Sequence, residues 1–196
     1  FLSIPATIAL VIGSEQIISA LFGYGSFDET SVYNSSLALY YFALGLPAFA
    51  FIKVFSSFFF ANHDTKTPFY ISLISVILNV IISVYYFNKI GFIIIPIATT
   101  ISSWFNSIIL FIYLINKGLF RFNKIFVINF IKIVFATFLM GAFFKYLIFI
   151  FQNQLTYDFN FKSFYLILSV ILGLIFYLIV SLIIKAFNFK DVKLKY

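Results

Sequence analysis

The sequence predicts an all-α, polytopic membrane protein, and three observations support this prediction. Hydrophobic residues make up 63% of the 196 residues and charged residues only 10%, whereas soluble domains are about 45–50% apolar and about 25% charged. The apolar residues form six long runs, and these runs do not alternate with polar residues as the strands of a membrane barrel would. The composition therefore excludes a soluble globular enzyme, and the absence of cysteine excludes a disulfide-rich secreted fold.

Each run is close to or longer than the roughly 20 residues that cross the hydrocarbon core of a bilayer. We expect six transmembrane helices, at residues 1–22, 36–61, 68–87, 91–115, 125–151 and 163–184. The first helix should end at Gly23 and Gly25, which can adopt a left-handed backbone. The third should begin at Thr67 and Pro68, as N-cap and first helical residue.

The second and fourth helices contain Pro47 and Pro96, each of which removes an intrahelical hydrogen bond and should kink its helix. Lys132 and Lys145 interrupt the fifth helix near its two ends, where long side chains can reach the membrane surface. The third, fourth and sixth helices carry no charge. The prediction is weakest for the fifth helix because of its two cations.

The loop cations set the expected orientation, since cytoplasmic loops are enriched in Lys and Arg. Eight cations fall on one side of the predicted topology and two on the other. The eight are Lys66, Lys117, Arg121, Lys124, Lys185, Lys190, Lys193 and Lys195. The start of the first helix and the C-terminus should therefore face the cytoplasm, and the net charge of +7 suggests loop charge rather than nucleic-acid binding.

The inventory of reactive residues argues against an enzyme. The chain has one His, no Cys, six scattered acids and eight scattered glycines, so it lacks a metal pair and a phosphate-binding loop. Transport, channel formation or scaffolding remain. The chain also begins at Phe1, inside an apolar run without the features of a signal peptide, and we expect a fragment whose N-terminal part is missing.

Ionisable residues at membrane depth are candidates for function, because burying them unpaired costs several kcal/mol. Lys53 lies about 12 Å from the end of the second helix at 1.5 Å per residue, and it either snorkels or faces an anion in a cavity. Glu15 lies in the first helix, in a wet vestibule or beside a cation. Asn79 and Ser83 share a face of the third helix, and Thr99 belongs to a polar stripe on the fourth; helix packing and a cation site both fit these positions.

Three ordered motifs resemble the C-terminal part of the MurJ/MviN family of lipid II flippases, within the superfamily of multidrug, oligosaccharidyl-lipid and polysaccharide exporters. They are residues 21–27 (LFGYGSF), Lys53-Val54 followed by residues 59–68 (FFANHDTKTP), and residues 97–106 (IATTISSWFN). The most specific of them is Asp64-Thr65-Lys66-Thr67-Pro68, placed between two membrane helices. The motifs lie within roughly residues 1–114, and the last two helices match by number and position only.

The resemblance implies part of a two-lobe flippase of about fourteen helices that works by alternating access. Residues 1–115 would be the last four helices of the second lobe, residues 125–187 two C-terminal helices forming a lipid groove, and residues 188–196 a basic cytoplasmic tail. The implied cargo is lipid II, the undecaprenyl-diphosphate-linked peptidoglycan precursor, moved across the bacterial inner membrane. The implied partners are that lipid, membrane lipids and the missing N-terminal lobe, with no nucleic acid.

The resemblance also assigns candidate residues. Lys53 would face the cavity, and Asp64, Lys66, Thr67 and Pro68 would contribute to a gate between the lobes or simply cap a helix. Some members bind sodium at positions matching Asn79, Ser83 and Thr99. Because the family pattern has Asp where this chain has Ser83, we expect a weakened sodium site and no other cofactor. Two alternatives remain open: a flippase for another polyprenyl-linked glycan, and a membrane scaffold subunit without transport activity.

Overall fold

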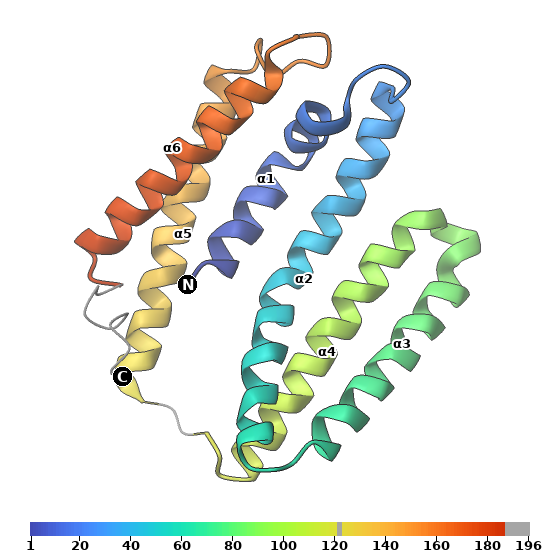
Figure 1. Ribbon diagram of the computed structural model, residues 1–196, viewed down its shortest axis with the longest axis vertical. Helices are drawn as coiled ribbons and strands as arrows, with labels where there is room; N and C mark the ends of the chain where they lie inside the picture. Colours follow the sequence, from blue (N-terminus) through green and yellow to red (C-terminus); the bar gives the residue numbers. More distant parts are fainter. Residues whose placement is uncertain (121–122, 187–196) are drawn as a thin grey trace. The chain divides into compact units, whose positions relative to one another are not determined.

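A computed structural model of the chain describes residues 1–120 and 123–186, and these residues contain six α-helices and no β-strand. The all-α prediction is confirmed (Figure 1). The helices are α1 (Ser3–Phe22), α2 (Glu29–Ala61), α3 (Lys66–Ile90), α4 (Ile94–Asn116), α5 (Lys124–Ile150) and α6 (Lys162–Ile183), with a short 3-10 helix, η1 (Gly91–Ile93), before α4. Arg121 and the expected tail at 188–196 lie outside the described residues.

Within the described part of the chain, five stretches are long and apolar enough to cross a membrane. One of them, Lys66–Asn116, contains both α3 and α4, so the five stretches comprise the six expected helices. The observed ends lie within a few residues of the expected ones except for α2, which begins at Glu29 instead of residue 36. The fold is that of a multi-pass membrane protein.

The chain divides into two compact units. The first contains residues 1–36 and the segment from 122 onward, and therefore α1, the start of α2, α5 and α6. The second contains residues 37–121, and therefore the rest of α2, α3 and α4.

In the first unit, small residues let α1 and α5 approach closely. A Cβ added to Gly13 would lie 2.9 Å from Cε1 of Phe144, and one added to Gly141 would lie 2.7 Å from Cγ2 of Ile8. Both distances are shorter than real Cβ contacts, so a larger residue would push the helices apart. Glycine at such crossings is a common feature of membrane helix packing, where van der Waals contact drives association.

The end of α1 differs from the expectation at Gly23. Only Gly25 has a left-handed backbone, with φ of +61°, whereas Gly23 has φ of −71° and ψ of 61°. Those angles define an inverse γ-turn, closed by a hydrogen bond of 2.7 Å from Tyr24 N–H to the Phe22 carbonyl. A Cβ on Gly23 would lie 2.6 Å from the carbonyl oxygen of Ser19, so crowding explains glycine at this turn.

In the second unit, α4 packs against both other helices around a buried core of Phe59, Ile71, Leu110 and Leu114. Helix α2 continues through Pro47, which lacks an N–H group for the carbonyl four residues earlier. Two neighbouring carbonyls of that turn receive donors from α4: Thr100 Oγ1 lies 2.6 Å from the Tyr41 oxygen, and Trp104 Nε1 lies 3.0 Å from the Leu44 oxygen. These donors hold α4 against carbonyls on either side of Ala43, whose own carbonyl is the one that Pro47 leaves without its helical donor.

Two helix starts also differ from expectation. Helix α4 begins at Ile94, so Pro96 lies in its first turn, where backbone N–H groups have no intrahelical acceptor, and the expected loss of a hydrogen bond does not arise. Helix α3 begins at Lys66, and the side chain that caps it belongs to Asp64 instead of Thr67.

Candidate functional site

Polar side chains join α3 to α4 along one seam. Asn79 Nδ2 donates hydrogen bonds to Thr99 Oγ1 at 3.1 Å and to Ser102 Oγ at 3.3 Å. At the end of the seam nearer the loop before α3, Asn106 Nδ2 donates a hydrogen bond to Ser72 Oγ at 3.3 Å. The two amides thus bridge the helices in opposite directions, and the structure brings together the polar faces that the sequence placed on each helix.

Part of this polar seam lacks partners. Among the described residues, Ser83 Oγ and Asn106 Oδ1 are buried without a hydrogen-bond partner. A cavity of about 410 Å³ lies beside Ser83 and Ile95. The Ile95 carbonyl accepts a hydrogen bond of 2.8 Å from Thr99 Oγ1.

We asked whether these residues fit a sodium ion. Hard cations favour several oxygen ligands that include carboxylates. Here the Asn79 N–H group donates to Thr99, the Ile95 carbonyl accepts from Thr99, and Ser83 supplies a hydroxyl in place of a carboxylate. These residues include no carboxylate, so they form a weak ligand set for a sodium ion.

The loop between α2 and α3 is organised around Asp64. Its carboxylate accepts hydrogen bonds from Thr67 N–H at 3.0 Å and Thr67 Oγ1 at 2.7 Å, and it forms an ion pair with Lys117 at 2.5 Å. These donors, with Lys117 the strongest, hold the pKa of Asp64 well below its ordinary value. The sequence linked Asp64 to Thr67 and Pro68 within one motif, but it gave no sign of Lys117, which lies 53 residues away.

Lys53 lies on the exposed side of α2, eight residues before the helix ends at Ala61. Its neighbours Ile52 and Phe55 pack against the core of the second unit, so Lys53 faces the other way. Its ammonium forms no hydrogen bond or ion pair within the part of the chain that the structure describes. A lysine without such a partner in a membrane-spanning helix needs water or an anion around its charge.

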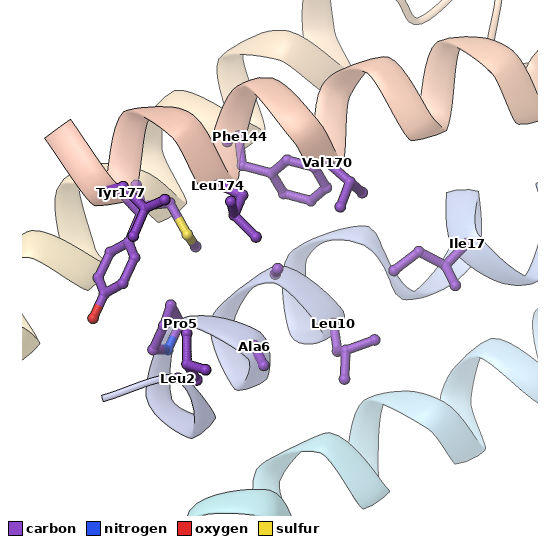
Figure 2. A pocket seen from close by; sticks show the side chains of 13 residues that line it. Leu2, Pro5, Ala6, Leu10, Ile17, Phe144, Val170, Leu174 and Tyr177 are labelled. Carbon is purple, nitrogen blue, oxygen red and sulfur yellow. The ribbon is translucent and has the colours of Figure 1, made fainter. Parts of the chain in front are cut away.

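An apolar pocket of about 480 Å³ lies in the first unit, between α1, α5 and α6. Figure 2 shows side chains of α1 on one side of it and side chains of α5 and α6 on the other. The lining residues are Leu2, Pro5, Ala6, Ala9, Leu10, Ile17, Met140, Phe144, Val170, Gly173, Leu174, Tyr177 and Leu178. Tyr177 is the lining residue with a polar side-chain group, and its phenol donates a hydrogen bond of 2.9 Å to the Phe1 carbonyl. The lining is otherwise apolar. The resemblance implied a groove on the last two helices but did not indicate the contribution of α1.

Two lysines have partners that the sequence did not reveal. Lys132, expected to snorkel, lies 3.4 Å from the carbonyl oxygen of Lys185, which follows the end of α6. Lys162, which with Lys89 makes up the two loop cations on the less basic side of the predicted topology, is 1% exposed and lies at the start of α6. Composition and spacing placed both near helix ends, but their acceptors come from distant segments.

The fold and these sites define a class: a multi-pass, all-helical membrane protein with an apolar pocket between helices, a polar seam and an exposed lysine in a helix long and apolar enough to span a membrane. The sequence model of a family described as "Lipid II flippase MurJ" matches residues 1–166. The chain belongs to this family.

Several curated relatives carry the description "Probable lipid II flippase MurJ". The relative from Rickettsia prowazekii is 38% identical over 112 residues, which cover 57% of this chain and 22% of that protein. The relative from Rhizobium meliloti is 40% identical over 120 residues (60% and 22%), and the one from Haemophilus influenzae is 28% identical over 178 residues (90% and 34%). The chain thus spans about a fifth to a third of the length of these relatives.

Proposed function

We propose that this chain contributes six membrane helices to a flippase that moves lipid II across the bacterial inner membrane by alternating access. Membership of the MurJ family supports the reaction and the cargo. The remaining helices of the transporter would come from residues outside this sequence, as the partial coverage of the relatives suggests. The chain would then act in transport and not as an enzyme, with no role for nucleic acid.

The apolar pocket between α1, α5 and α6 is the observation that carries this proposal. Lipid-binding sites need a long apolar surface with few polar groups, because each unpaired polar group in such a site costs free energy. The pocket offers that surface along α1 from Leu2 to Ile17 and along α6 from Val170 to Leu178. A polyprenyl tail fits this chemistry, whereas the sugars and diphosphate of lipid II do not.

Lys53 would meet the charged part of the cargo. A diphosphate crossing a membrane needs a cation that can form charge-assisted hydrogen bonds with it. The exposed ammonium of Lys53, unpaired within the described residues, has N–H donors available for this role. Snorkelling to the surface would leave it too far from the cargo, and the test below separates the two roles.

The motif at Asp64, Lys66, Thr67 and Pro68 would form part of a gate on the cytoplasmic side. The ion pair between Asp64 and Lys117 closes the loop between α2 and α3 onto the end of α4. The excess of loop cations on this side supports a cytoplasmic placement of the loop and of the C-terminus. Because the polar seam lacks a carboxylate, we propose no tight sodium site at Asn79, Ser83 and Thr99.

Complementation tests the proposal. The complete product of the gene should restore growth to a bacterium depleted of its own lipid II flippase. Lys53→Met should lower the rate of lipid II flipping by about tenfold or more, because a hydrogen bond to a charged group contributes about 1.5–3 kcal/mol. Lys89→Met is the matched control, since Lys89 is an exposed lysine whose ammonium lies near the rings of Tyr85 and Tyr86 and has no ion pair among the described residues.

Three results would contradict parts of this proposal. Normal membrane abundance without restored growth would argue against lipid II as the cargo. Restored export of a different polyprenyl-linked glycan would identify that glycan instead. Full flipping activity of the Lys53→Met protein would exclude Lys53 from the cavity and favour snorkelling.

A further inference from the structure

A buried cation lies at one end of the first unit, where it is surrounded by neutral groups. The Nζ atom of Lys162 donates to the Gly23 carbonyl at 2.6 Å and to the Tyr157 carbonyl at 2.6 Å. It also lies 4.3 Å from the ring centre of Tyr24 and 4.5 Å from that of Tyr157. Both rings are within the roughly 6 Å over which an aromatic face attracts a cation. Two carbonyls and two ring faces therefore compensate a charge that has no carboxylate partner among the described residues.

The next residue extends these contacts to α1. Ser163 Oγ donates to the Ala20 carbonyl at 2.6 Å, which leaves its lone pairs to accept from the Tyr24 hydroxyl at 2.7 Å. The Tyr157 hydroxyl donates to the Phe27 carbonyl at 2.7 Å. We refer to Tyr24, Tyr157, Lys162 and Ser163 together as the Lys162 latch.

The acceptors show why a cation suits this position. The last carbonyls of a helix have no intrahelical donor and carry partial negative charge. Ala20 lies in the last turn of α1 and Gly23 directly follows its end, so the latch supplies the missing donors. Gly23 also makes the approach possible, because a Cβ there would lie 3.2 Å from the Lys162 Nζ atom.

The latch lies beyond one end of the apolar pocket. Along α1, Ile17 is the last lining residue and Gly23 follows about 9 Å further on, at 1.5 Å per residue. Along α6, Val170 is the corresponding residue and Lys162 precedes it by about 12 Å. A buried cluster of Ala20, Leu155 and Leu166 fills this end of the unit, and Ile17 packs against it.

We infer that Lys162 is a positioning residue, which holds the ends of α1 and α6 together so that this buried cluster closes the apolar pocket at the Ile17 end. The inference rests on the proposed role of the pocket in binding a lipid tail. The pocket is then blind at this end, and the tip of a bound polyprenyl chain stops at Ile17 and Val170. The Lys162 latch thus acts by fixing where the pocket ends, and it takes part in no chemical step.

Hydrogen exchange in the complete protein tests the latch itself, without any lipid. Lys162→Met keeps the length of the side chain and removes its charge, so exchange in residues 20–28 and 157–163 should rise by about tenfold or more. Lys162→Arg should restore part of the protection, because it keeps the charge. Lys89→Met, the matched control, should leave both segments unchanged. Unchanged exchange in the Lys162→Met protein would overturn the inference.

A photoreactive lipid tests the closure of the pocket. Undecaprenyl phosphate with a benzophenone at the far end of its chain should label Ile17 or Val170 in the wild type, with the labelled residue located by fragmentation of the peptides. In the Lys162→Met protein the label should move to Ala20 or Leu166, whereas a purely structural defect would only reduce the total. Labelling that keeps its position in the variant would overturn the inference.

Two further outcomes distinguish a failure of the proposed lipid-binding role from a failure of the Lys162 latch. A wild-type pocket that takes no label contradicts its proposed lipid-binding role, and hydrogen exchange then decides whether the latch exists. If the Lys162→Met protein does not accumulate, Tyr24→Leu takes its place. This substitution removes one ring face and the Tyr24 hydroxyl that donates to Ser163, and it leaves Lys162 intact. Increased exchange in that variant supports the latch, and unchanged exchange overturns it.

Discussion

Lys117 donates a hydrogen bond of 2.5 Å to Asp64, and this contact joins the residue that follows α4 to the side chain that caps α3. The same carboxylate accepts from the backbone and the side chain of Thr67. One aspartate therefore fixes the loop between α2 and α3 from two directions.

The first prediction concerns the relative weight of these contacts. Asp64→Ala removes both the cap and the ion pair, so hydrogen exchange in the first turn of α3 should become several-fold faster. Lys117→Met removes only the ion pair. Lys117 contributes most to the lowered pKa of Asp64, but its side chain is 44% exposed and solvent screens the pair, so the effect of this substitution on exchange should be smaller. Equal effects of the two substitutions would show that the cap contributes nothing.

The pH dependence of this loop follows from the lowered pKa of Asp64. The unfolded carboxyl group titrates near 3.8, and in the folded protein the pKa is lower because Lys117 and Thr67 donate to the charged form. The stabilisation is therefore fully present above pH 3.8 and is lost as the pH falls through the folded pKa. Exchange in residues 64–67, corrected for its intrinsic pH dependence, should stay constant down to about pH 5 and rise only in stronger acid. The Asp64→Asn protein should lack this transition.

The polar seam leads to a prediction about sodium. Ser83 Oγ is buried without a partner beside a cavity, and a carboxylate at this position would supply the hard ligand that the seam lacks. Ser83→Asp should therefore introduce sodium-dependent protection of α3 and α4 against hydrogen exchange, whereas the unsubstituted protein should respond equally to sodium and potassium. Adding Asn79→Leu should abolish the gain. Strong sodium protection without the substitution would show that the present donor set suffices.

The sequence predicted the helices well because each is a long, mainly apolar run, and hydropathy locates such runs even where one or two charges fall inside them. It placed the start of α2 too late, because Glu29, Thr30 and Ser31 are polar and suggest a loop. In the structure, Asp28 caps this end by accepting from Ser31 N–H at 2.9 Å. A polar first turn outside the membrane is invisible to a hydropathy argument.

The site was predicted only where its residues share a helix face or a short motif. Asn79 and Thr99 were identified from their spacing, and Asp64 from its neighbours. The burial of Lys162 could not be predicted, because it depends on Gly23, 139 residues earlier in the chain. The pocket was missed at α1 for a related reason: the polar residues of this helix do not gather on one face, so the sequence gives no periodic signal of which face meets a partner.

The last prediction concerns Phe144, whose ring is 1% exposed and lies at the wall of the pocket between two glycines. Its Cε1 atom would be 2.9 Å from a Cβ on Gly13, and its Cδ2 atom 3.5 Å from a Cβ on Gly173. In a membrane the lipid is as apolar as the protein interior, so the ring stabilises the unit by contact and not by transfer from water. Phe144→Ala should still leave a cavity among three helices and destabilise the protein by about 2–4 kcal/mol, toward the lower part of the range for buried aromatic residues in soluble cores.

Phe138, on the same helix and 73% exposed, provides the matched control, and Phe138→Ala should change stability by no more than about 0.5 kcal/mol. Unfolding of the complete protein in bicelles measures both, and equal losses would mean that contact with lipid replaces the helix contacts of Phe144.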